Sequence, residues 1–322
     1  DNSWLRPVNR MLIFAIAAVG LNLLSGVAGQ VSLGHAFFMG VGASTAVLVG
    51  GASTSRLWGW GLPMWIWLPA AGLVAAAVGV LVAPAAVRVR GLYLGIATIG
   101  LVFIGIHLSR VFPEIAGPPQ LGRKWPRLEL RFWKEETPFV DFSRKGHWLW
   151  FDIGNNQKTY LLLLVILLVL SLVAANLARS RTGRSWAAIR DRDVAAEIMG
   201  VPEFRAKTTA FAISSFYAGV AGALFASLSG YMYPEAWNLL LSVEMIAILL
   251  IGGMGRISGA LMGSFFVALS PRFLEESVRW AAEQAEGEGV FAGIWDSLIS
   301  LGPSDFGFIS VKEMAMGFPL PA

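Results

Sequence analysis

Residues 11–55 contain no Asp, Glu, Lys or Arg, and this uncharged run of 45 residues limits what the chain can fold into. A helix needs about 20 apolar residues to cross a bilayer, so the run is long enough for two spans joined by a turn. Two glycines, Gly26 and Gly29, weaken the helix near its middle and mark the turn. Only 14% of all residues are charged, against about 25% in soluble domains. We therefore expect a membrane protein.

Further apolar segments continue this pattern along the chain. They lie at 67–87, 91–109, 160–178, 208–228, 239–251 and 257–270. With the two spans in 11–55, they predict an all-α, polytopic integral membrane protein of eight spans, with 1–322 as a single transmembrane domain. The sequence leaves open whether further spans precede Asp1 or follow Ala322.

Loop charges predict the orientation of these spans. The side that holds the polar segment 179–207 also holds Arg88, Arg90 and Arg256, and it carries 10 basic and 4 acidic residues. The opposite side carries 15 basic and 16 acidic residues. Because an excess of Lys and Arg marks the cytoplasmic side, 179–207 is expected inside. The long segment 110–158 then lies outside, where we expect short helices or strands, and the acidic tail 272–322 also lies outside.

The polar segment between two apolar spans has the spacing of an amphipathic helix. Apolar residues such as Trp186 and Ile189 alternate with charged ones, which gives one apolar and one charged face. Gly200 followed by Pro202 predicts where the helix ends. Two interpretations are open. The helix could lie in the lipid headgroups, or it could dock a protein partner at the cytoplasmic face.

The same segment resembles a known family. Ala195-Ala196-x-x-x-Gly200 is similar to the core of the cytoplasmic loop of ABC importer permeases, although Val194 stands where an acidic residue often opens that motif. The longer string GRSWAAIRDRDVAAEIMGV at 183–201 resembles permease subunits of the branched-chain amino acid (Liv-type) importers. Similar strings are GLNLLSGVAGQVSLGHAFFMGVGAS at 20–44, RVRGLYLGIATIG at 88–100 and LLIGGMGRISG at 249–259.

The resemblance implies a function and a set of partners. In that family 179–207 would be a coupling loop that inserts into an ATP-hydrolysing subunit, and the core would have ten spans with discontinuous helices. The partners implied are two ATP-binding-cassette ATPase subunits, a second and paralogous permease subunit, and an extracytoplasmic solute-binding protein. Residues expected to couple to the ATPase are Arg184, Trp186, Ile189, Arg190, Arg192, Ala195, Ala196, Glu197, Met199 and Gly200.

Polar residues within the spans are candidates for the substrate path. Glycines and polar side chains at membrane depth must face protein or a wet cavity, and broken helices hold polar substrates in many transporters. The candidates are Gln30, Ser32, His35, Ser44, Thr45, Thr98 and Glu244. Close helix packing is an equally good interpretation of the glycines, and a satisfied structural histidine is the favoured one for His35. Glu244 should have a partner or snorkel to the interface.

The sequence contains no grouping typical of an enzyme. The three histidines, His35, His107 and His147, have no metal-ligand spacing. We therefore expect no cofactor on this chain, with ATP and Mg²⁺ bound by the partner subunits. A net charge of +4 spread over membrane loops argues against nucleic-acid binding. The expected function is inward movement of a small polar solute across the bacterial inner membrane. The alternative is a self-sufficient secondary transporter or channel, which would need intramembrane ionisable groups such as Glu244.

Overall fold

The computed structural model describes residues 2–53, 57–89, 91–117, 122–125, 128–130, 140–141, 146–148 and 151–285. Its longer helices are α1 (Asn2–Leu21), α2 (His35–Gly50), α3 (Met64–Arg88), α4 (Leu92–Val111), α6 (Asn155–Arg179), α7 (Arg181–Ile198), α8 (Glu203–Ser229), α9 (Leu239–Gly252) and α10 (Ile257–Ala285). Short helical elements are the π-helix η1 (Asn22–Val27), α5 (Pro113–Ala116) and the 3₁₀-helix η2 (Pro234–Ala236).

The chain divides into two compact units, residues 1–268 and 269–322, and the division falls within α10. The first unit contains α1 to α9 and the start of α10. In the second unit, Arg272 forms ion pairs one turn along the helix with Glu275 and Glu276. The tail predicted at 272–322 is therefore helical as far as Ala285, and the rest of it lies outside the described residues.

Seven helices of the described residues are long and apolar enough to cross a membrane, and α2, with 16 residues, is a shorter apolar helix. These eight match the eight predicted spans. The predicted bounds were wrong at both ends of the series: the first span starts at Trp4 rather than Met11, and the last helix runs beyond residue 270. A helix satisfies its own backbone hydrogen bonds, so it can continue past the apolar stretch that sequence reading detects.

The predicted turn within 11–55 is a break in the helix. α1 continues directly into η1, which ends at Val27, and α2 begins eight residues later at His35. Gly29 in the connection has a φ of +68°, a backbone conformation that glycine adopts without strain. The glycines that weaken the helix in the sequence thus separate α1 from α2.

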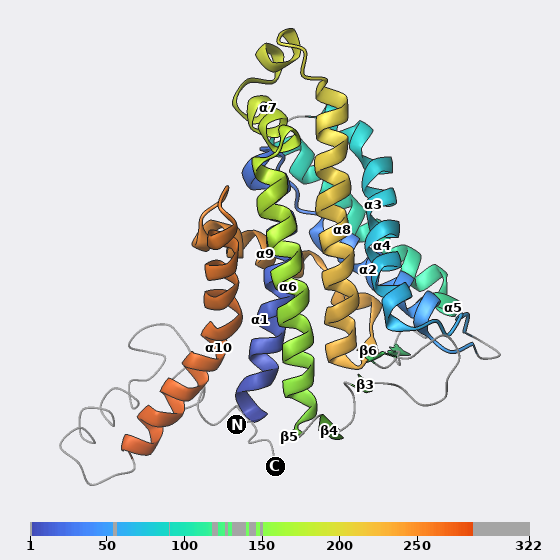
Figure 1. Cartoon of the computed structure of the whole chain (residues 1–322), viewed down its shortest axis with the longest axis vertical. Helices are drawn as coiled ribbons and strands as arrows, with labels where there is room; N and C mark the ends of the chain where they lie inside the picture. Colours follow the sequence, from blue (N-terminus) through green and yellow to red (C-terminus); the bar gives the residue numbers. More distant parts are fainter. Residues whose placement is uncertain are drawn as a thin grey trace, which may run out of the picture. The chain divides into compact units, whose positions relative to one another are not determined.

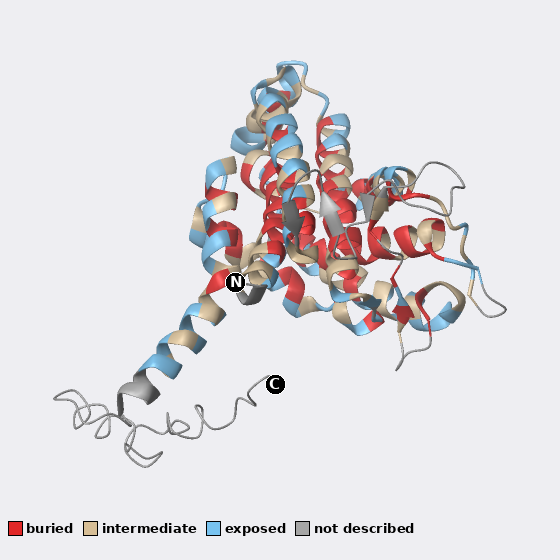
Figure 2. Cartoon of the chain, turned by 60° about the horizontal axis from the view of Figure 1, so that its bottom comes forward, coloured by how far each residue is buried: buried red, intermediate tan, exposed pale blue. Residues whose placement is uncertain are grey.

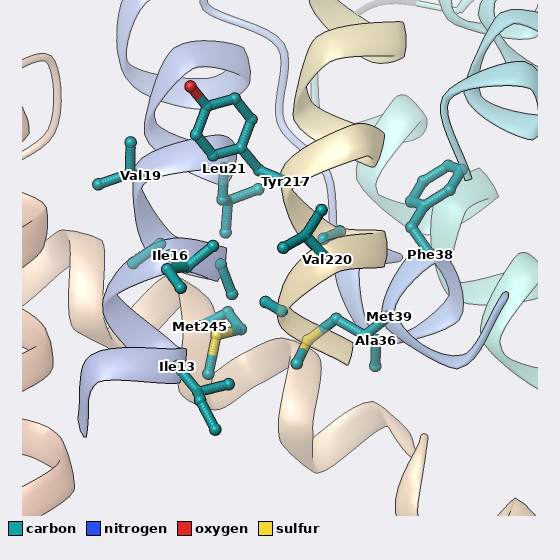
Figure 3. Packing of buried hydrophobic residues seen from close by; sticks show 14 of the residues in the cluster. Ile13, Ile16, Val19, Leu21, Ala36, Phe38, Met39, Tyr217, Val220 and Met245 are labelled. Atoms are coloured by element: carbon teal, nitrogen blue, oxygen red, sulfur yellow. The ribbon is translucent and has the colours of Figure 1, made fainter. Parts of the chain in front are cut away.

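The core of the first unit lies around α1 and α8, which are mostly buried. Figure 3 shows side chains of α1, α2, α8 and α9, among them Ile16, Met39, Val220 and Met245, gathered in one cluster. Figure 2 shows the buried residues concentrated in the middle of this unit. The outer helices leave large apolar side chains exposed, as a lipid-facing surface requires; on α6 these are Leu161, Val165, Leu168, Val169, Leu172 and Val173.

Glycines allow α2 and α8 to cross at backbone contact. A Cβ atom on Gly222 would lie 2.0 Å from the Met39 carbonyl oxygen, and one on Gly42 would lie 2.2 Å from that of Gly219. Small residues at helix crossings are a common way to pack helices in membranes. This crossing therefore depends on glycine at positions 42 and 222, because a side chain there would separate the two backbones.

Gly222→Ala will destabilise the chain, because the two backbones cannot both keep their positions around an added methyl group. Overpacking of this kind costs about 1–3 kcal/mol. Gly100→Ala on α4 is the matched control, since a Cβ atom there would meet nothing within 4 Å. Thermal unfolding of both variants in detergent should show a lowered midpoint for Gly222→Ala alone, and equal midpoints would contradict the close crossing.

The two ends of the first unit carry different structures (Figure 1). α7 lies at one end, and the strands of the segment between α4 and α6 lie at the other. Three antiparallel pairs form there, β1 (Arg123–Lys124) with β6 (Tyr231–Met232), β2 (Glu129–Leu130) with β3 (Val140–Asp141), and β4 (Gly146–Trp148) with β5 (Phe151–Ile153). This separation agrees with the alternation of loops from which the orientation was inferred.

Candidate functional site: the α7 end and the helix break

The first half of α7 is anchored to the helix bundle. Trp186 is buried, and its indole N–H donates to the Ala206 carbonyl oxygen at 3.0 Å and to the Thr209 hydroxyl at 3.2 Å. Ile189 is buried as well. A Cβ atom on Gly183 would lie 2.1 Å from the Ala178 carbonyl oxygen, so the turn from α6 into α7 requires glycine. The apolar face of this half belongs to the protein interior.

The second half of α7 projects away from that anchor. Arg192 interrupts the helix with an extended backbone, at a φ of −157° and a ψ of 100°. Beyond it Val194 is exposed, and Ile198 and Met199 are 81% and 83% exposed. Gly200 then has a φ of +86° and ends the segment, as predicted. We call Val194, Ile198 and Met199 the α7 tip. Its exposed apolar side chains are typical of a surface that another molecule covers.

Arg190 connects α7 to the break between α1 and α2. Its Nη1 donates to the Gly26 carbonyl oxygen at 2.8 Å, within η1. Its aliphatic part packs against Gly29, where a Cβ atom would lie 2.4 Å from the Arg190 Cγ. The Asp191 carboxylate accepts from Arg190 Nε at 3.3 Å. A side chain of α7 is thereby bonded to the carbonyl group of a discontinuous membrane helix.

The loop between α9 and α10 meets the same place. The amide N–H of Gly255 donates to the side-chain oxygen of Asn22 at 2.7 Å, and Asn22 is fully buried in η1. Gly255 has a φ of +89°, which allows this tight approach. The break is therefore held from two sides, by α7 and by the loop after α9.

The structure thus divides the ten residues predicted to couple to an ATPase. Trp186, Ile189 and Ala196 are buried in this chain, so they would position α7 rather than contact a partner. Arg190 faces the break. Those exposed at the surface are Arg184, Arg192, Ala195, Glu197, Met199 and Gly200. The Arg190 side chain is itself 45% exposed, although one of its nitrogens bonds the break. Sequence reasoning left Ile198 and Val194 out of the coupling set, although their exposure makes them the strongest contact candidates together with Met199.

Four of the predicted path residues form bonds that hold the break in place. Gln30 Nε2 donates to the Ala28 carbonyl oxygen, and the Ser32 hydroxyl accepts from the Gly34 amide at 3.4 Å. Thr98 Oγ1 on α4 accepts from the Leu33 amide at 2.9 Å. His35 Nε2 lies 3.0 Å from the Ala17 carbonyl oxygen, and since a carbonyl can only accept, this nitrogen carries the proton. These contacts favour the structural interpretation of His35.

Two other predicted path residues, Ser44 and Thr45, line a cavity of about 230 Å³. It lies between α2 and α4, beside α5, and Trp237 contributes to its wall. The remaining lining residues are Phe37, Gly40, Val41, Leu48, Val102, Gly105, Leu108, Ser109, Phe112, Ile115 and Ala116. Gln30, Ser32, His35, Thr98 and Glu244 do not line it. The predicted path residues are therefore not all brought together.

Glu244 on α9 has the partner that its position requires. Arg10 Nη2 on α1 lies 3.3 Å from one carboxylate oxygen, and the Arg10 guanidinium also stands 4.8 Å from the centre of the Phe14 ring. A charge within a span is costly when unpaired, so this ion pair joins α1 and α9. Among the described residues, no group of three or more His, Cys, Asp or Glu could hold a metal ion.

Comparison with known proteins gives a consistent result. A family model described as branched-chain amino acid transport system, permease component, matches residues 5–295. The high-affinity branched-chain amino acid transport system permease protein LivM of Escherichia coli (strain K12) is 33% identical over 293 residues, 88% of this chain and 66% of that protein. LivM of Salmonella typhimurium (strain LT2) is 32% identical over the same shares.

A shorter match involves another transport system. The xylose transport system permease protein XylH of Escherichia coli (strain K12) is 34% identical over 112 residues, 32% of this chain and 28% of that protein. No solved structure matches the chain significantly. The matched part covers 66% of each LivM relative, slightly less than two thirds of its length.

Proposed function

The chain belongs to the family of branched-chain amino acid transport system permease components, and on that premise we propose that it is the membrane-spanning subunit of an ABC importer. The solute is a branched-chain amino acid or a related small polar compound, and it moves inward across the bacterial inner membrane. Two ATPase subunits hold ATP and Mg²⁺. A second, paralogous permease subunit completes the path, and a solute-binding protein delivers the solute to the outer end.

One observation carries this proposal: α7 combines an exposed apolar tip with a direct bond to a helix break. The α7 tip offers Ile198 and Met199 to a partner, while Arg190 on the same element is bonded to Gly26. Motion that an ATPase imposes on the α7 tip would therefore reach the helix break through Arg190, with few residues in between. Such coupling shifts the population between outward-open and inward-open states.

The rival function, a self-sufficient secondary transporter or channel, fits less well. It needs ionisable groups in the membrane that exchange ions or protons with the solute path. Glu244 is paired with Arg10, and His35 is bonded to the Ala17 carbonyl oxygen. Both groups already serve the packing of helices, which leaves the ATPase-driven function as the better supported of the two.

Co-purification tests the proposal. The tagged chain is solubilised from its native membranes, and the proteins that remain bound are identified and quantified. We expect an ATPase with a nucleotide-binding site in stoichiometric amount. A chain that purifies without any ATPase, yet still moves leucine in vesicles, would contradict the proposal.

A further inference from the structure

The cavity between α2 and α4 is built to receive an apolar group. The hydroxyl groups of its lining already have partners: Ser44 donates to Gly40, Thr45 to Val41 and Ser109 to Gly105, each to a backbone carbonyl oxygen within its own helix. The rest of the lining is apolar or glycine, apart from the buried indole N–H of Trp237, which has no hydrogen-bond partner. At about 230 Å³ the cavity is smaller than sites for drug-sized ligands, which measure about 300–1,000 Å³. It suits the apolar part of a small molecule.

Two residues next to the cavity lining in the sequence form an ion pair. Arg110 Nη2 on α4 lies 3.4 Å from Glu235 Oε1 in η2. Arg110 follows the lining residue Ser109, and Glu235 precedes the lining residue Trp237 by two positions. The pair therefore joins α4, which walls the cavity, to η2, which directly precedes the lining residue Trp237. It lies at the end of the unit opposite α7, because α4 and α8 both end there (Figure 1).

We propose that the cavity and this ion pair form a binding site for a free α-amino acid with an aliphatic side chain. The side chain fills the cavity, the carboxylate binds Arg110 and the ammonium group binds Glu235. The proposal rests on the proposed function, since it names where the solute is first held on this subunit. Neither the family match nor the relatives assign these residues.

The ion pair is exposed and loosely bonded, so a zwitterionic ligand can replace the contact between its two residues. The two side chains are 56% and 48% exposed, and a single contact at 3.4 Å links them. Exposed pairs of this kind contribute little to stability, so opening the pair costs little. A zwitterion replaces each partner with an equivalent charge, and Arg can hold a carboxylate through two parallel hydrogen bonds. A ligand with only one charge would leave the other residue unpaired.

Binding of L-[³H]leucine to the assembled importer in nanodiscs, without nucleotide or binding protein, tests the site. Each buried methylene contributes about a fourfold gain in affinity, so leucine, with three more carbons, should bind about 60-fold more tightly than alanine. Leucine analogues that lack the ammonium group (4-methylpentanoate) or the carboxylate (3-methylbutylamine) should compete poorly. Arg110→Ala and Glu235→Ala should each weaken leucine binding by about tenfold. Ser44→Phe, which fills the cavity, should weaken leucine binding but change alanine binding much less.

A charge exchange gives the sharpest result. Arg110→Glu combined with Glu235→Arg keeps an ion pair between the same elements but exchanges the positions of the two charges. The ligand's side chain still fills the cavity, but its carboxylate and ammonium group must exchange places. Exchanging two substituents on the α-carbon gives the opposite enantiomer. The double variant should therefore prefer D-leucine, whereas the wild-type importer prefers L-leucine. Its intact ion pair also controls for a merely structural role.

Several results would overturn the site. One is a double variant that still prefers L-leucine. Another is a leucine affinity that neither Ser44→Phe nor Arg110→Ala changes; this result is expected if a lipid acyl chain occupies the cavity. The same binding is measured on this chain as it purifies, with or without a bound ATPase, so an absent ATPase would defeat the proposed function without affecting this binding. Conversely, ATP-driven leucine uptake that all these variants leave unchanged would overturn the site alone.

Discussion

Replacing Ile198 and Met199 together by aspartate will release the ATPase subunits from this chain while the helix bundle stays folded. Both side chains are more than four-fifths exposed, so their loss removes nothing from the core. Burying an aliphatic side chain of this size contributes about 1.5–3 kcal/mol, so the two changes should weaken association by about 10²–10⁴-fold. Co-purification of the ATPase subunits with the tagged chain, quantified against wild type, measures the effect.

The matched control for the α7 tip is Ser185→Asp, a new carboxylate on the anchored half of α7, where Ser185 is only half-buried. It should leave the ATPase bound. If the α7 tip lay in lipid headgroups instead, the tip variant would keep its ATPase, and that outcome would refute the docking interpretation.

Arg190→Ala will leave the ATPase subunits attached but separate ATP hydrolysis from transport. The change removes the charged hydrogen bond to the Gly26 carbonyl oxygen and leaves the α7 tip intact. Hydrogen bonds to charged groups contribute about 1.5–3 kcal/mol. If all of this free energy couples ATP hydrolysis to transport, its loss would lower the uptake rate by about 10–100-fold. Uptake and ATP hydrolysis are measured together in proteoliposomes, and uptake per ATP should fall. The exposed neighbour Arg192 supplies the control, because Arg192→Ala leaves the bond to Gly26 in place.

A covalent bond should restore what Arg190→Ala removes. The chain contains no cysteine. A Cβ atom on Gly29 would lie 3.0 Å from the Arg190 Cβ, so a small separation of the two backbones reaches the distance of about 3.5–4.5 Å in disulfides. Because Gly29 has a φ of +68°, the single variant Gly29→Cys is the control for backbone strain. In the double variant Gly29→Cys/Arg190→Cys, coupling should be low when the thiols are reduced and should recover on oxidation. Equal coupling in both redox states would show that α7 and the break need no direct link.

The sequence predicted those parts of the site that depend on local pattern. The polar helix, its end at Gly200 and the break around Gly26 and Gly29 follow from residue spacing and backbone preference. The structure confirms the end and the break, and it divides the helix into two pieces at Arg192. For Glu244 the sequence left open a partner or an interfacial position, and the structure shows a partner. That partner, Arg10, lies 234 positions away in the sequence, so local pattern could not identify it.

Contacts between distant segments account for what was missed. Arg190 was predicted to couple to an ATPase, and its bond to Gly26, which spans 164 positions, was not predicted. The extended backbone at Arg192 divides one amphipathic pattern into an anchored half and an exposed half, and the pattern alone does not distinguish these. The cavity includes Val102 and Trp237, apolar residues that carry no signal of a binding role until the helices are placed.

Leucine uptake into proteoliposomes, with ATP confined to the side that bears α7, tests the central claim that a separate ATPase drives this chain through α7. The assembled importer is compared with the permease subunits alone, each with and without an imposed proton gradient. We expect uptake in the assembled importer when ATP is present and none from the permease subunits alone under any gradient. Leucine uptake by the permease subunits alone that follows the proton gradient would contradict the account and support the secondary-transporter alternative.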